Sequence, residues 1–240
     1  MTDDTTGDTG TGGETDSPAQ ESVVVPGGRD VRGTLDRAAR GANHAVDDDT
    51  DHRTSDETAD ACVVACPPHP QHRGHRGDDR LVAVSETVRA AGIDCLRFDY
   101  GDWDEGYGER ADVRAAVDWA RERYDCVGLF GFSFGATLSL LVAGEDRDVA
   151  VVVALAPTAR IASDLDAVAA VPSVTAPLRV VYGSRDDVAD CEPVVAAVAD
   201  ARRAGADAET RELAADHFFV GQTDQVAAAA GEPLVSVLAE

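Results

Sequence analysis

A serine between two glycines is the feature of this chain best suited to chemistry. Ser133 lies in Gly131-Phe132-Ser133-Phe134-Gly135, after the apolar run 126–130 and before the helix-forming run 136–143. A strand, Gly-x-Ser-x-Gly and a helix together are typical of a nucleophile elbow, a strained turn that presents a serine hydroxyl. Small glycines let the strand and helix approach closely. The five-residue pattern is loose by itself, so its partners must decide whether Ser133 is catalytic.

The residue predicted to activate Ser133 is His217. A serine hydroxyl needs a base to take its proton, and a carboxylate usually orients that base. For an elbow serine the expected chain order is serine, acid, histidine. His217 is the only histidine downstream of Ser133, and it follows the predicted strand 208–213. The alternative is a histidine that only packs or faces solvent.

The predicted acid is Asp186, at the end of the predicted strand 178–183. Its neighbour Asp187 is the alternative, although a solvated or helix-capping role is more ordinary for it. The other usual place for the acid is after the preceding strand. Residues 156–160 there read Ala-Pro-Thr-Ala-Arg and contain no carboxylate.

A tetrahedral intermediate also needs backbone N–H donors. One is predicted at Phe134, directly after the serine and at a helix N-terminus. The second is expected in the loop 67–72, Pro-Pro-His-Pro-Gln-His. Proline has no N–H, so His69 is the leading candidate and Gln71 the next.

Three histidines in and after this loop form H-x-x-H-x-x-H, namely His69, His72 and His75. A metal site is the weaker interpretation, because zinc needs a fixed ligand set and supporting hydrogen bonds. We therefore predict no metal and no cofactor.

The elements that must position these residues alternate between strand and helix from residue 60 onward. Strands are predicted at 61–66, 93–99, 126–130, 149–155, 178–183 and 208–213, and helices at 80–91, 109–124, 136–143, 192–203 and 225–238, the last interrupted by Gly231 and Pro233. A hairpin, 22–25 and 30–35, precedes them. This order predicts an α/β fold with a doubly wound, mostly parallel sheet and a site at the carboxyl ends of the strands.

The length of 240 residues fits one domain. We predict a disordered acidic tail at 1–21, a domain at 22–240 and a flexible acidic insertion at 39–59. About 22 residues separate the strands 149–155 and 178–183. This leaves no room for a large lid, so an open site for small substrates is expected.

The strongly negative charge of the chain and its cysteines indicate which partners and which cellular location to expect. The formal net charge is −24 and every basic residue is arginine. Such a surface repels nucleic acid and anionic membranes, so we expect neither as a partner, and a small acyl compound instead. The acidic start and the five cysteines, read as reduced and mostly buried, favour a cytoplasmic protein. The sequence leaves the oligomeric state open.

These motifs resemble those of alpha/beta-hydrolases, nearest the small dienelactone-hydrolase-like and prolyl-oligopeptidase-like branches. The resemblance covers about residues 60–240 and rests on the loop 67–71, the segment 96–101, the elbow, Gly183 to Asp186, and Asp216-His217-Phe218-Phe219. It implies a Ser-Asp-His triad and an acyl-enzyme. Dienelactone hydrolases proper use a cysteine nucleophile, so that activity is not implied. The loop also lacks the His-Gly-Gly of many esterases.

The predicted function is hydrolysis of an ester or related acyl bond by Ser133, His217 and Asp186. The same triad could serve a thioesterase, an amidase or peptidase, or an acyltransferase. A non-catalytic binding or regulatory member of the fold is the alternative of another class.

The composition also resembles that of halophilic proteins, which are acidic, poor in lysine and rich in Ala, Val, Asp and Thr. Residues 61–240 alone carry 30 acids and 16 arginines. At ~1 M salt the Debye length is ~3 Å, so self-repulsion is screened. We predict that the melting temperature, followed by circular dichroism, rises markedly from dilute buffer to molar KCl. Equal melting temperatures in the two solutions would contradict this.

Overall fold

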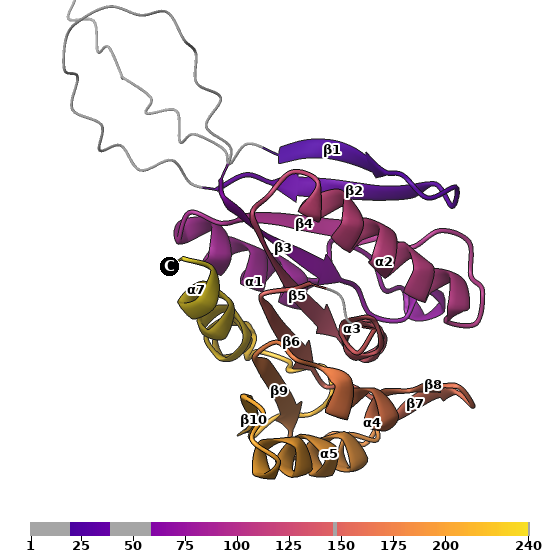
Figure 1. Ribbon diagram of the computed structural model, residues 1–240, viewed down its shortest axis with the longest axis vertical. Helices are drawn as coiled ribbons and strands as arrows, with labels where there is room; N and C mark the ends of the chain where they lie inside the picture. Colours follow the sequence, from indigo (N-terminus) through magenta and orange to yellow (C-terminus); the bar gives the residue numbers. More distant parts are fainter. Residues whose placement is uncertain (1–19, 39–58, 146–147, 240) are drawn as a thin grey trace, which may run out of the picture.

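An eight-stranded sheet forms the centre of the molecule (Figure 1). The computed structural model describes residues 20–38, 59–145 and 148–239. The strand order is β1-β2-β4-β3-β5-β6-β9-β10. Strand β2 runs antiparallel to both of its neighbours, β1 and β4, and the strands from β4 to β10 in this order run parallel to one another. The strands are β1 Gln20–Val25, β2 Val31–Asp36, β3 Ala61–Cys66, β4 Asp94–Asp99, β5 Cys126–Phe132, β6 Val151–Leu155, β9 Leu178–Gly183 and β10 Ala208–Leu213. The predicted doubly wound, mostly parallel sheet with an N-terminal hairpin is confirmed.

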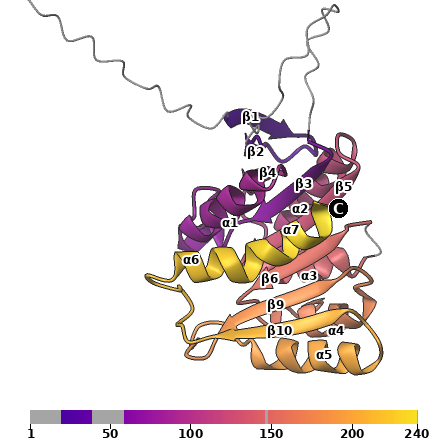
Figure 2. The same ribbon diagram turned by 90° about the vertical axis from the view of Figure 1, so that its left-hand side faces the viewer.

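Helices cover both faces of this sheet. The main ones are α1 Asp79–Ala90, α2 Tyr107–Arg121, α3 Phe134–Ala143, α4 Ala167–Ala170, α5 Glu192–Arg203, α6 Thr223–Val226 and α7 Glu232–Leu238. One apolar core lies under α2, α3 and α5, and a second lies under α1, α6 and α7. Figure 2 shows the second face, with α1, α6 and α7 in front of the strands. Burial on both faces explains why β3 and β6 are apolar at nearly every position.

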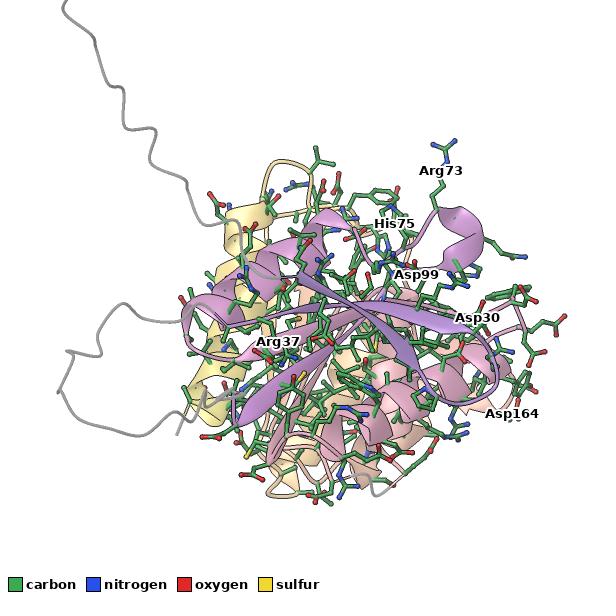
Figure 3. The ribbon with its side chains drawn as sticks, turned by 90° about the horizontal axis from the view of Figure 1, so that it is seen from above. Asp30, Arg37, Arg73, His75, Asp99 and Asp164 are labelled. Carbon is green, nitrogen blue, oxygen red and sulfur yellow. The ribbon has the colours of Figure 1, made fainter. Side chains whose placement is uncertain are left out.

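The two ends of the strands are distinct in Figure 3, which looks down on the hairpin. Arg37 follows β2 and lies at the end where the parallel strands begin, whereas Asp99 is the last residue of β4 and lies at their carboxyl ends. His75 and Arg73, from the loop after β3, lie at the same end as Asp99 (Figure 3). This is the end at which ligands bind in open parallel sheets.

The first strand begins earlier than predicted. β1 starts at Gln20, so residues 20 and 21 belong to the sheet and not to the acidic tail predicted for 1–21. Two polar contacts hold them: Gln20 Nε2 donates to Asp36 Oδ1 at 2.8 Å, and Glu21 pairs with Arg37 at 2.7 Å. The remainder of the predicted tail, and the predicted insertion apart from residue 59, lie outside the described residues.

The C-terminal helical segment is not interrupted as predicted. A π-helical turn, Ala227–Gly231, joins α6 to α7. Gly231 allows a close approach to α1, because a Cβ there would lie 2.7 Å from Thr87 Cγ2. Pro233 directly follows this π-helical turn, in the first turn of α7.

The connection between β6 and β9 is compact. It contains a small hairpin of β7, Arg160–Ala162, and β8, Leu165–Asp166, followed by α4 and a 3₁₀ turn. Tyr107 Oη donates to Asp164 Oδ1 at 2.6 Å and ties the hairpin to α2. The connection therefore forms no large lid, as predicted.

The state of the cysteines and the character of the helices can be compared with the expectation of reduced, mostly buried cysteines and no membrane partner. Cys62, Cys66, Cys95 and Cys191 are buried, Cys126 is exposed, and all five are free thiols. Within the described ranges, no helix combines the length and the apolar character that crossing a membrane requires.

The elbow glycines generate a prediction about stability. A Cβ on Gly135 would lie 2.3 Å from Cys66 O and 2.5 Å from Pro67 O, both backbone atoms that cannot move easily. Gly135→Ala is expected to lower the free energy of unfolding by about 1–3 kcal/mol or more, measured by urea unfolding in molar KCl. Gly77→Ala is the matched control, because its Cβ would meet only the exposed His75 ring. Equal effects of the two substitutions would be the contrary result.

Candidate active site

Ser133 lies in a strained backbone conformation between β5 and α3. Its φ of 54° and ψ of −116° are unusual for a residue with a side chain. Gly131 and Gly135 make the turn possible, because a Cβ on Gly131 would lie 2.3 Å from Gly135 O. Ser133 N donates to Leu155 O at the end of β6 at 2.8 Å. The turn therefore has the geometry of the predicted nucleophile elbow.

A hydrogen-bonded chain links Ser133 to His217 and Asp186. His217 Nε2 lies 3.0 Å from Ser133 Oγ, and His217 Nδ1 lies 2.8 Å from Asp186 Oδ2. His217 follows β10 and Asp186 follows β9, so adjacent parallel strands deliver both to the same edge of the sheet. The side chains of His217 and Asp186 are buried, at 4% and 3% exposure, while Ser133 is partly exposed. The structure thus brings together the three residues predicted as a triad.

The surroundings of Asp186 distinguish it from Asp187. Asp186 Oδ1 accepts the backbone N–H groups of Val188 and Ala189 at 3.0 and 2.9 Å. These bonds leave Oδ2 directed at His217. Burial raises the pKa of Cys191 to about 12, so its thiol stays protonated and makes a weak 3.9 Å contact with Asp186 Oδ2. Asp187 is exposed.

The predicted oxyanion donors lie on segments that meet at the elbow. Phe134 is the first residue of α3, and the first N–H groups of a helix have no partner within it. The loop after β3 packs against the elbow at Gly135. Tyr100 Oη donates to Pro67 O at 3.0 Å and fixes that loop. Gln71 N donates to His69 Nδ1 at 3.3 Å, so the Gln71 N–H has its own partner and His69 remains the better candidate.

Aromatic rings form a wall beside the elbow. The His69 ring centroid lies 4.6 Å from His72, 4.6 Å from Trp103 and 4.8 Å from Phe134. Burial, and then the neighbouring His72, lower the pKa of His69, so its ring is neutral over a wider pH range. We call these four rings the aromatic wall.

The three loop histidines have partners other than a metal. His69 and His72 stack on each other, and His75 Nδ1 accepts the Gly77 N–H at 2.9 Å. In the described part of the chain, no group of three or more potential ligands is arranged to hold a metal ion.

Sequence reasoning missed several residues that support the site. They are Arg80, Tyr100, Trp103, Phe132 and Cys191. Arg80, Tyr100 and Trp103 contact residues far away in the chain, and neither Phe132 nor Cys191 is of a residue type that the motif requires.

Structures of known proteins share this fold. An alpha-beta serine hydrolase homologue from Coxiella burnetii is 23% identical, with 89% of this chain and 97% of that chain covered and a TM-score of 0.69. An alpha/beta serine hydrolase without lid from Xanthomonas campestris is 22% identical over 91% and 95% of the two chains, also with a TM-score of 0.69. Est1E from Butyrivibrio proteoclasticus is 18% identical over 93% and 100%, with a TM-score of 0.72. No curated protein matches the chain in sequence.

One family model matches the sequence itself. It describes the X-Pro dipeptidyl-peptidase (S15 family) and matches residues 98–222, more than half of the chain. The matched segment includes Ser133, Asp186 and His217. The chain therefore belongs to the X-Pro dipeptidyl-peptidase (S15) family, and it is a hydrolase with the alpha/beta-hydrolase fold.

Proposed function

We propose that the protein cleaves an ester or related acyl bond of a small substrate through Ser133, His217 and Asp186. The observation that carries the proposal is the continuous hydrogen-bonded chain, 3.0 Å from Ser133 Oγ to His217 Nε2 and 2.8 Å from His217 Nδ1 to Asp186 Oδ2. A strained serine, a base in contact with it and a buried carboxylate behind the base form the arrangement that activates a hydroxyl.

The proposed mechanism assigns one task to each group. Ser133 Oγ attacks the substrate carbonyl while His217 Nε2 takes the hydroxyl proton. The N–H groups of Phe134 and His69 bind the oxyanion that forms. His217 then returns the proton to the leaving group, which leaves an acyl-enzyme. Water attacks this ester, again with His217 as base, and releases the acid and Ser133.

The aromatic wall favours substrates with a flat acyl group. Rings within about 4.5–7 Å attract one another through offset or edge contacts, and Trp103 and His69 are partly exposed next to the elbow. Among the structural relatives are an esterase from Pyrococcus furiosus and Est1E, which was also solved with ferulic acid bound. The lidless connection after β6 suits a small substrate that enters from solvent.

Related reactions are distinguished by a substrate panel. The same triad chemistry could hydrolyse thioesters or peptides with a penultimate proline, or transfer an acyl group to an alcohol. A panel assayed in molar KCl would rank these activities; it contains short aliphatic esters, an aryl ester, a thioester and an X-Pro arylamide.

We further propose that the enzyme works in the cytoplasm of a salt-adapted cell, which is consistent with its charge of −24.

A fluorophosphonate probe tests the catalytic assignment. Ser133 of the wild-type protein is expected to be labelled covalently in molar KCl, and Ser133→Ala is expected to abolish labelling and to lower kcat by about 10⁴-fold or more. Peptide mapping locates the adduct. Labelling of Ser133→Ala at the wild-type rate, or no labelling of the wild-type protein, would favour a non-catalytic member of the fold.

The acid is tested by two neighbouring substitutions. Asp186→Asn can still accept the N–H groups of Val188 and Ala189, but its amide faces His217 Nδ1 and favours the wrong tautomer. We expect kcat to fall by about 10³- to 10⁴-fold. Asp187→Asn is the matched control, because Asp187 is exposed, and its kcat is expected to equal that of the wild type. A larger loss in Asp187→Asn than in Asp186→Asn would reverse the assignment.

A further inference from the structure

Arg80 is an arginine near the start of α1 whose side chain reaches the active-site edge of the sheet. Its side chain is largely buried, at 19% exposure. Helix α1 lies beside α6, on the face turned toward the viewer in Figure 2, and His217 lies in the segment that leads from β10 into α6. An arginine here can therefore contact the loop that carries the base.

The first contact is with the backbone next to His217. Arg80 Nη1 donates to Phe218 O at 2.9 Å. The loop turns sharply at the following residue, Phe219, which has a positive φ of 50°. A charge-assisted hydrogen bond is stronger than a neutral one, so this contact restrains the loop directly after the base.

The second contact is with the residue before Ser133. The Arg80 guanidinium carbon lies 4.5 Å from the centroid of the Phe132 ring, within the range of a cation–π interaction. The Phe132 ring in turn lies 5.4 Å from the His217 ring and 6.3 Å from the Phe219 ring. One side chain thus contacts the neighbours of both the serine and the histidine.

Asp78 holds Arg80 in this orientation. Asp78 is the N-cap of α1, and its Oδ1 accepts both Arg80 N at 3.0 Å and Arg80 Nε at 2.8 Å. Asp78 Oδ2 also pairs with Arg80 Nη2. The guanidinium fork is therefore fixed on one side, which leaves Nη1 directed at Phe218 O.

We propose that Arg80 is a positioning residue, which holds the His217 loop against Phe132 and so keeps His217 Nε2 within hydrogen-bonding distance of Ser133. The inference rests on the proposed function for its kinetic consequence. Arg80 lies behind His217 and acts through Phe218 and Phe132, so it affects the reaction through the placement of the base. A misplacement of about 1 Å can cost about 10²-fold in rate.

The kinetic test compares two arginines of the same helix. Arg80→Ala is expected to lower kcat by about 10- to 100-fold with little change in KM, because Arg80 acts through Phe218 and Phe132 on the placement of His217. Arg89→Ala is the matched control: Arg89 also donates to a backbone carbonyl, Arg37 O at 2.6 Å, but far from the triad. We expect Arg89→Ala to change stability and to retain the wild-type kcat. Rates are normalised to the labelled serine, which corrects for unfolded protein.

Two milder substitutions keep the test decisive where Arg80→Ala does not fold. Arg80→Lys retains the charge and can reach one partner but not three, so kcat is expected between those of Arg80→Ala and the wild type. Asp78→Asn retains the helix cap but loses the ion pair, and a smaller loss of kcat is expected. Wild-type kcat in both variants would overturn the proposal.

A spectroscopic measurement separates this inference from the proposed function. The Nδ1–H proton of His217, hydrogen-bonded to Asp186, is expected as a downfield proton resonance that disappears in His217→Gln. It should broaden or shift in Arg80→Ala and stay unchanged in Arg89→Ala. An unchanged resonance in Arg80→Ala, or equal loss of kcat in both arginine variants, overturns the positioning role. A wild-type protein that resists the fluorophosphonate probe but shows these spectral changes would refute the proposed function alone.

Discussion

The close approach of backbone at the elbow is the constraint on which the rest of the site depends. Gly131 and Gly135 lie so near other backbone that a Cβ on either would come within 2.3 Å of a carbonyl oxygen. This contact brings the start of α3 against both β5 and the loop after β3. Ser133 is held in an unfavourable conformation as a result, and the two candidate oxyanion donors lie on the two segments that meet there. Larger residues at these two positions would separate Ser133 from the two candidate donors.

His217 depends on a different kind of support. Ser133 is fixed by the turn itself, whereas His217 lies on a long loop that regular secondary structure does not restrain. Its loop is held from two sides: Arg185 N donates to Ala215 O at 2.9 Å, and Arg80 binds Phe218 O at 2.9 Å. The segments before and after the histidine are therefore anchored to different parts of the fold, the turn that follows β9 and helix α1. A hydrogen bond of 3.0 Å to Ser133 is maintained because both anchors are present.

The sequence predicted what depends on local pattern and chain order. The sequence alone shows the elbow, the single histidine downstream of it, and Asp186 directly after the strand that was expected to carry the acid. The structure brings these three features together. The choice of Asp186 over Asp187 needed the backbone N–H groups that the structure places on Asp186. The role of Arg80 could not be predicted, because its two partners at the site, Phe132 and Phe218, are 52 and 138 residues away along the chain. An arginine is also no signal by itself in a chain whose basic residues are all arginine. The start of β1 was misjudged because polar side chains, rather than apolar ones, extend that strand.

The aromatic wall shows why the N-terminal hairpin belongs to the site. Trp103 lies in a loop held by Glu109, a fully buried carboxylate that accepts the N–H groups of Asp104 and Gly106 at 2.8 Å each. Arg29, from the turn between β1 and β2, donates to the carbonyl of Asp102 and lies 4.0 Å from Glu109. Arg29 also pairs with the buried Asp112 at 2.8 Å, so one arginine of the hairpin lies against two buried carboxylates of α2. The hairpin thus helps to hold the loop that carries Trp103, and a rigid wall loses little entropy when a molecule packs on it.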